Sequence, residues 1–306
     1  MTSSSFLVAS RGHMATTWIT RALNALPLTL AVHDGKPVAV DYTKPLSWQL
    51  AHLREARPGL DRYGLVHSVN GTSLFYAYSH GDLIPGQAKT AQLCRNPIML
   101  AESMAAVTQR DWMTAPKFRS WAQVMRASIL KGRLNGVELN WPASVKELIA
   151  ANDERAISRL LGIWNRTLLE ATDLFFCNAI HQLLAKRGNK PGEAHPIFRF
   201  EDYTANRVVF SRLCDHIAGV NLDAAAVDRA FAVPALNPHR ASAVNDPAEV
   251  YRAWTSAERD MFDTIVAVTG LAAFLENSGL YRLSDDGAAA SLNRSSEFNL
   301  RAVLAT

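Results

Sequence analysis

The chain of 306 residues is 48% hydrophobic and 20% charged, and its 32 basic and 28 acidic side chains give a formal net charge of +4. These values are ordinary for a soluble globular enzyme, and the small basic excess favours an anionic ligand. No basic run is dense enough to indicate a nucleic-acid partner, and no apolar stretch reaches the roughly 20 residues that span a bilayer, so the sequence argues against both.

The first predicted elements are a strand at 6–10 and a helix at 15–26, joined by a turn of small residues that carries two basic side chains. A strand that feeds a helix through such a turn gathers backbone N–H groups and the positive end of the helix dipole, which together form an anion site. Thr17 and Trp18 stand where a nucleoside-triphosphatase P-loop carries Lys and Ser or Thr. The turn therefore predicts a phosphate cradle without nucleotide hydrolysis.

The following pattern alternates between strands and helices. It predicts, in chain order, a short strand at 37–41, a helix at 46–56, a buried strand at 63–68, a loop or hairpin from Asn70 to Gly86, a strand at 88–94 and a helix at 99–112. This alternation indicates an α/β fold, with a central, mostly parallel sheet flanked by helices and ligands bound at the carboxyl ends of the strands.

The second half of the chain reads as mainly helical. Residues 117–187 have sustained helical periodicity, which ends at Gly188, and a strand follows at 197–201 after a connector. We interpret the region 111–187 as a helical insertion, either a cap over an acceptor pocket or a packing element. The whole chain, 1–306, is predicted to form one domain.

The cysteines and histidines give no sign of a metal site. Cys94, Cys177 and Cys214 lie in apolar contexts without Cys-x-x-Cys spacing, which predicts buried reduced thiols. No histidine or carboxylate cluster has the spacing of metal ligands, so we expect no metal. The N-terminus passes almost directly into the first strand, so we also expect no signal peptide.

Three motifs, in this order along the chain, resemble sulfotransferases that use 3'-phosphoadenosine 5'-phosphosulfate (PAPS). The first turn ends in Thr-Thr-Trp-Ile, Arg95 begins an Arg-Asn-Pro motif with Ser103 beyond it, and residues 198–219 look like the family's strand, acidic pair and amphipathic helix. Residues 254–281 look like its closing helices. The resemblance implies a P-loop-like phosphate-binding turn and a soluble, cytoplasmic, bacterial-type enzyme.

The resemblance also implies roles for the residues of the first turn. The backbone of Ala15, Thr16 and Thr17, together with the two hydroxyls, would hold the 5'-phosphosulfate. Trp18 would pack the first helix onto the sheet and could also border the nucleotide. His13 stands where the family usually has Lys or Arg. Either a protonated His13 or the nearby Arg11 would then supply the positive charge.

Arg95 and Ser103 would hold the 3'-phosphate. Met99 stands where the family often has Asp. His67, at the end of its strand, is the predicted general base, with His80 as the substitute, and Asp41 or Asp82 could orient or replace a histidine. The acidic pair Glu201-Asp202 is interpreted as a helix cap.

These residues predict a sulfotransferase that moves a sulfuryl group from PAPS to a hydroxyl or amine of a small-molecule or glycan acceptor by in-line displacement. His67 would act as the base and His13 would assist. A catalytically impaired nucleotide-binding relative, with a sensing or assembly role, is the alternative, favoured by His13 and Met99. A small-molecule kinase is disfavoured, since the turn lacks the P-loop Lys. The sequence leaves open whether the protein forms a homo-oligomer.

Overall fold

The computed structural model describes residues 3–12, 14–66, 69–112, 140–218, 222–234, 246–281 and 283, and between 113 and 139 it describes residues 123, 126, 127, 130, 131, 133, 134, 137 and 138. The chain divides into two compact units, Met1–Arg95 with Thr172–Pro238, and Asn96–Ala171 with His239–Thr306. The single-domain interpretation stays a prediction.

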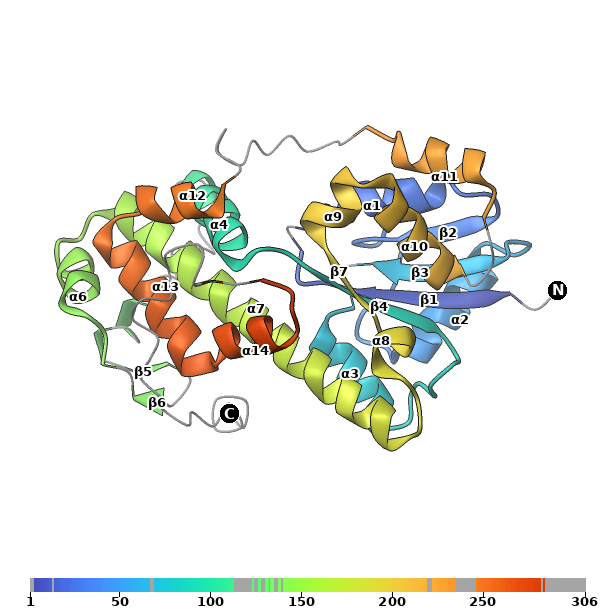
Figure 1. Ribbon diagram of the computed structural model, residues 1–306, viewed down its shortest axis with the longest axis horizontal. Coiled ribbons are helices and arrows are strands. Elements are labelled where there is room, and N and C mark those ends of the chain that lie inside the picture. Colours follow the sequence, from blue (N-terminus) through green and yellow to red (C-terminus); the bar gives the residue numbers. More distant parts are fainter. Residues whose placement is uncertain are drawn as a thin grey trace. The chain divides into compact units, whose positions relative to one another are not determined.

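The first unit contains a five-stranded parallel sheet, which confirms the α/β class (Figure 1). Its strands are β1 (Ser4–Ala9), β2 (Thr29–Val32), β3 (Arg62–Val66), β4 (Lys89–Cys94) and β7 (Ile197–Arg199). They lie in the order β2-β3-β1-β4-β7, and every neighbouring pair is parallel. The strands β1 and β2 are almost entirely buried, as expected of a parallel sheet covered by helices.

Helices of the first unit lie between these strands in the chain or follow the last of them. They are α1 (Thr16–Asn24), α2 (Leu46–Ala56), α3 (Gly71–Ser79), α8 (Pro191–Ala194), α9 (Phe200–Ala205), α10 (Arg207–Ala218) and α11 (Ala224–Phe231). One core cluster joins Leu7 and Ala9 of β1 to leucines of α2, to Leu74 of α3, and to Ile180 and Leu184. Because side chains alternate along a strand, Phe6 and Val8 face the other side of the sheet.

Two of the elements predicted for this unit are wrong. Residues 37–41 are not a strand; the second strand is Thr29–Val32, which is buried throughout, whereas Val38 and Val40 pack only partly against the core. The predicted loop from Asn70 to Gly86 contains α3. Asn70 caps this helix, since its Oδ1 accepts the N–H of Ser73 at 2.9 Å, and apolar side chains of the helix fill the core.

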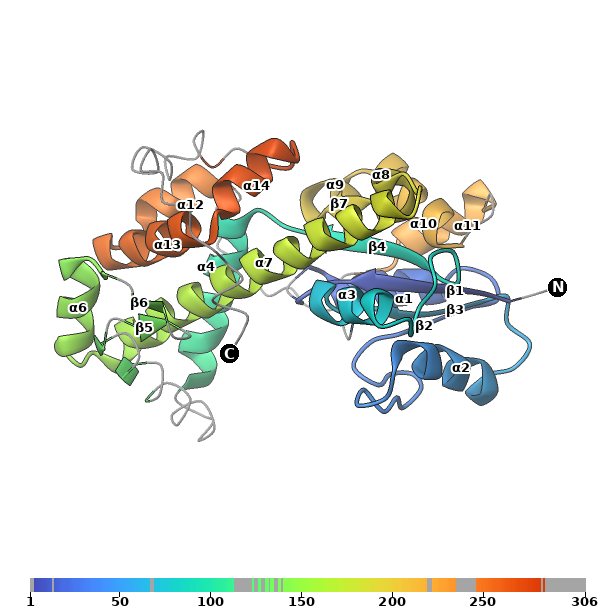
Figure 2. The same ribbon diagram turned by 90° about the horizontal axis from the view of Figure 1, so that it is seen from below.

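The second unit is mainly helical. It contains α4 (Pro97–Trp112), α6 (Ala143–Ala150), α12 (Pro247–Ala253), α13 (Ser256–Thr269) and α14 (Leu271–Asn277). The long helix α7 (Glu154–Lys186), visible along its length in Figure 2, contributes residues to both units. The helical prediction for 117–187 is confirmed over α6 and α7. It is wrong at β5 (Arg133–Leu134) and β6 (Val137–Glu138), which pair antiparallel.

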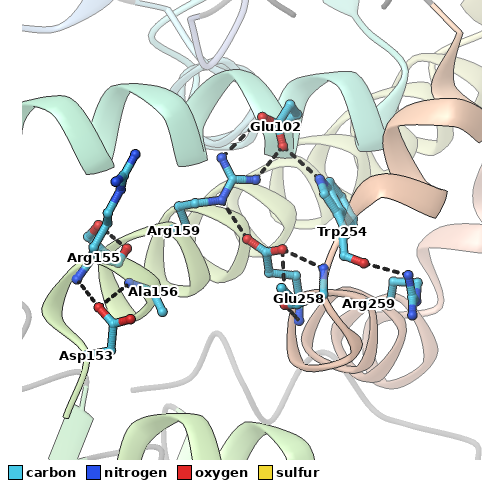
Figure 3. A network of polar contacts seen from close by, with 10 residues as sticks. Glu102, Asp153, Arg155, Ala156, Arg159, Trp254, Glu258 and Arg259 are labelled. Atoms are coloured by element: carbon cyan, nitrogen blue, oxygen red, sulfur yellow. Dashed lines mark hydrogen bonds and ion pairs between the residues drawn. The ribbon is translucent and has the colours of Figure 1, made fainter. Parts of the chain in front are cut away.

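Arg159 of α7 is the centre of a polar network in the second unit (Figure 3). Its Nε donates to Glu258 Oε1 at 2.6 Å, and its two Nη atoms donate to the carboxylate of Glu102 at 3.2 and 2.8 Å. Trp254 also donates to Glu102, and Glu258 completes a capping box with Thr255 at the start of α13. The network therefore joins α4, α7 and α13 through one guanidinium.

In the same unit, α7 and α4 approach each other closely at Gly162. A Cβ at Gly162 would lie 2.7 Å from Cα of Ala105 in α4, closer than van der Waals contact allows, so the helices touch where the side chain is absent. Across the described part of the chain, no helix is long and apolar enough to cross a membrane.

Candidate functional site

The parallel sheet brings the segments after β1 and β4 out at the same edge. Connections from β1 lead toward β2 and β3 on one side, whereas β4 and β7 lie on the other, so the order changes direction between β1 and β4. Ala9 and Gln92 are partners across these two strands. In open α/β sheets, ligands bind outside the carboxyl ends of the strands at such a switch point.

The turn from β1 to α1 has an unusual backbone. Gly12 has φ 82°, and its N–H donates to Ser10 Oγ at 3.0 Å. Ala15, at the start of α1, has φ 50°, a left-handed conformation that is rare for a residue with a Cβ. An alanine side chain cannot cap a helix, so the first-turn N–H groups of α1 are not capped from this position.

Asp173 of α7 anchors this edge of the sheet. Its Oδ1 accepts the Nε–H of Arg11 at 3.2 Å and the N–H of Gly71 at 2.6 Å, and its Oδ2 accepts from Gln92 Nε2 at 2.7 Å. Arg11 also donates to Thr72 Oγ1 at 2.7 Å. The carboxylate is 1% exposed, so it ties the segments after β1 and β3 to β4 from within the protein.

Gly71 is needed for this arrangement. A Cβ at this position would lie 2.7 Å from the carbonyl oxygen of Asp173, so only glycine allows the start of α3 to approach α7 this closely. The backbone N–H of Gly71 can then reach the carboxylate directly. Helix α3 is thus joined both to α7 and, through Thr72, to Arg11.

Arg95 follows the carboxyl end of β4 and is buried, with 8% of its surface exposed. Its guanidinium lies 4.4 Å above the ring centre of Phe200, the first residue of α9. Stacking of this kind orients the plane of the guanidinium and its donors. Ser103 and Met99 belong to α4 in the second unit, where Ser103 is partly buried and Met99 is buried.

Trp18 packs α1 against the last helices of the first unit. Its ring lies 5.4 Å from Phe210, 6.1 Å from Phe231 and 6.5 Å from Tyr203, and its Nε1 donates to the carbonyl of Val233 at 2.7 Å. The sequence predicts packing of the first helix onto the sheet, whereas these ring contacts join α1 to the helices α9, α10 and α11. The predicted contact with the nucleotide stays a prediction.

Tyr203 holds the turn between β1 and α1 through a hydrogen bond. Its hydroxyl donates to the carbonyl of Met14, directly before Ala15. Burial raises the pKa of Tyr203 well above its usual value, so the phenol stays protonated and keeps this bond at any physiological pH. Thr16 is buried, and its hydroxyl lies 3.4 Å from His33 Nε2, whereas Thr17 is partly exposed.

The two predicted catalytic histidines, His13 and His67, lie outside the described residues. His80 is exposed and lies with Asp82 on the segment that enters β4 at its amino end, the edge opposite Arg11 and Arg95. Both line an open cleft of about 290 Å³ with Lys44. Asp82 accepts from the backbone and hydroxyl of Ser47.

Asp41 is likewise occupied locally. It accepts from the N–H of Thr43 at 3.0 Å and from its hydroxyl at 2.6 Å, and these bonds lower the pKa of this exposed carboxyl. The predicted cap role of the acidic pair Glu201-Asp202 is wrong: Arg199 is the N-cap of α9, and no side chain caps the helix. The two acids lie within its first turn, where Asp202 pairs with Arg199. These acids serve local structure.

Sequence reasoning did not identify Asp173, because it lies within a helical block without a motif. A signal was present, since Arg166, Glu170 and Asp173 are charged residues on the buried face of an otherwise apolar stripe. A buried charge needs a partner, but the sequence does not name it. Comparison of the chain with family models, curated proteins and solved structures found no match, so the functional assignment rests on the residues themselves.

Proposed function

We propose that the protein is a PAPS-dependent sulfotransferase. The observation that carries the proposal is the parallel order β3-β1-β4, in which the start of α1 and Arg95 follow neighbouring strand ends at one edge. Helix N-termini bind phosphate through backbone N–H groups, and arginine binds it through a planar pair of donors. The two ends of a bisphosphorylated nucleotide require two such positions.

In the proposed reaction, His67 accepts the proton of the acceptor hydroxyl, a new bond forms between that oxygen and the sulfur, and the bond from sulfur to the phosphate oxygen breaks. The leaving group is 3',5'-phosphoadenosine. The N–H groups of Ala15, Thr16 and Thr17 stabilise the charge that develops on its 5'-phosphate. Positioning and electrostatics supply most of the acceleration.

The contacts of Arg11 refine the choice left open by the sequence. Arg11 already donates to Asp173 and Thr72. We therefore assign Arg11 to holding the turn and propose His13 as the side chain that contacts the phosphosulfate. Arg95 and Ser103 hold the 3'-phosphate.

Calorimetric titration with 3',5'-phosphoadenosine and with AMP tests the cofactor class. We expect the bisphosphate to bind more tightly, and Arg95→Ala to weaken it about 10- to 100-fold while leaving AMP little changed, because hydrogen bonds to charged groups contribute about 1.5–3 kcal/mol. Arg62→Ala is the matched control, since Arg62 begins β3 at the opposite edge. Equal affinity for both nucleotides would refute the proposal.

The alternative is a nucleotide-binding relative without transfer activity, favoured by His13 and Met99 at positions where the family has other residues. Incubation with labelled PAPS and a panel of hydroxyl and amine acceptors separates the two. Sulfotransfer that disappears in His67→Ala supports the enzyme. Tight bisphosphate binding, with no transfer to any acceptor, supports the relative.

A further inference from the structure

A second cluster of chemically reactive side chains lies at the opposite edge of the same sheet. Cys177 and His181 are one turn apart on α7, and His195 directly precedes the segment that leads into β7. One ligand atom from each residue lies within 4.8 Å of those of the other two. All three belong to the first unit, and the cluster does not depend on the proposed function.

The two histidines are held by hydrogen bonds that define their tautomers. His181 Nε2 donates to the carbonyl of His195 at 2.8 Å. His195 Nδ1 lies 3.0 Å from Thr90 Oγ1, whose own proton is donated to the carbonyl of Ala194, so Nδ1 is the donor. Each imidazole thus gives one ring N–H to an oxygen and keeps a lone pair on its other nitrogen. Metal-binding histidines are oriented in this way.

His195 carries an unusual buried atom. The side chain is fully buried, and its Nε2 has no hydrogen-bond partner among the described residues. An unsatisfied buried nitrogen is costly, about 1–3 kcal/mol, unless something binds it. Cys177 Sγ lies 3.9 Å from His181 Nε2, the nitrogen that carries the N–H, so Nδ1 of His181 is the atom that would bind an ion, and the thiol adds a soft ligand.

We propose that Cys177, His181 and His195 bind a zinc ion, with the fourth position held by water or a small ligand. One thiolate and two imidazoles suit zinc, and sites with three protein ligands keep an open position. Tetrahedral coordination needs ligand atoms roughly 3.3–3.6 Å apart, whereas these atoms lie within 4.8 Å of one another, so the side chains must rotate toward the ion to complete the site. His181, the partly exposed member, gives the route of entry.

The ion would join α7 to the segment before β7 and, through Thr90, to β4. It would therefore stabilise the amino ends of β4 and β7, the two strands whose carboxyl ends lead into Arg95 and Phe200. This assignment replaces the expectation, drawn from spacing alone, that the chain has no metal site. The spacing rule did not identify it because His195 comes from another segment.

Cobalt(II) is the probe, because a thiolate ligand gives it a charge-transfer absorption band that oxygen and nitrogen ligands do not. Full-length protein, reduced and stripped of metal, is titrated with Co²⁺ alone. We expect one ion per chain with the thiolate band, displaced by Zn²⁺. Cys177→Ser should lose the band, and the matched control Cys214→Ser, which changes another buried thiol, should keep it.

Thr90→Val tests the orienting bond to His195 and should weaken metal binding about 10- to 100-fold. If Cys177→Ser does not fold, X-ray absorption of the wild-type zinc form decides, with one sulfur and two imidazole nitrogens expected. No stoichiometric binding by the wild type, no sulfur in its coordination shell, or equal loss of the band in Cys214→Ser would overturn the proposal.

Discussion

Replacement of Asp173 by asparagine is the sharpest test of how the carboxyl edge of the sheet is held. Asparagine keeps Oδ1 for Arg11 and Gly71 but puts an amide donor where Oδ2 accepts from Gln92. Two donors then face each other, and the guanidinium loses its counter-charge. We expect the free energy of unfolding to fall by about 2–3 kcal/mol, less than for a fully buried pair because Arg11 is 19% exposed.

An exposed pair in the same unit is the control. Arg207 and Asp228 form a shorter bond, 2.6 Å against 3.2 Å for Arg11 and Asp173, but their side chains are 40% and 59% exposed. Water screens them, so Asp228→Asn should cost less than about 1 kcal/mol. If distance alone set the energy, the order would be reversed.

Urea unfolding followed by circular dichroism measures these differences. A double-mutant cycle of Arg11→Met and Asp173→Asn should be non-additive by about 1–2 kcal/mol, because each change alone leaves the other partner uncompensated. An additive cycle, or a loss in Asp173→Asn no larger than in Asp228→Asn, would refute the account of Asp173 as the anchor of this edge.

Three further substitutions test the second unit, and one control substitution lies in the first unit. All are measured by urea unfolding. Arg159→Met should cost about 3–5 kcal/mol, since it leaves two carboxylates without their shared cation. Gly162→Ala should destabilise by about 1–3 kcal/mol despite better helix propensity, whereas Gly192→Ala, with open space around it, should change stability by less than about 0.5 kcal/mol. Burial raises the pKa of Asp263 to about 6, so wild-type stability should fall as pH rises from about 4 to about 6, and Asp263→Asn should remove that fall.

Local patterns predicted the elements that are determined locally. The helix at 46–56 was predicted with the bounds that the structure has, and the first strand and helix within a few residues, because apolar spacing and short buried runs act within one segment. Helix α3 was missed although Asn70 is a readable cap. Its glycine and serine residues suggested a loop, and only the core decides that Leu74 is buried.

The second strand shows a related limit. Both 29–32 and 37–41 are short apolar runs, and each could extend beside β3. Which of them pairs with β3 depends on where α1 and the following turn leave the chain. In the structure, Thr29–Val32 is the run that pairs in register with Arg62–Leu65. Propensity does not distinguish two runs of similar composition when tertiary pairing decides between them.

The sequence places candidate residues after strand ends, but it does not identify their partners when these are distant along the chain. Asp173 and Arg11 are separated by 162 positions, and no local pattern links them. The same holds for Arg95 and Phe200. A single sequence can therefore propose which side chains contact a ligand, but it does not show which of them are already paired or stacked with other side chains of the protein.

This difference matters for the two arginines at the carboxyl edge. The charge of Arg11 is compensated by Asp173, so in the proposed site the attraction of the turn for an anion would come mainly from backbone N–H groups and the helix dipole. Loss of Arg11 should then lower stability and nucleotide affinity together, because the turn itself shifts. Arg95 lies on the ring of Phe200. If it is a direct ligand, Arg95→Ala should reduce the free energy of binding the 3'-phosphate by more than it reduces the free energy of unfolding. Unfolding and binding measured on the same variants therefore separate a residue that shapes the proposed site from one that contacts the proposed nucleotide.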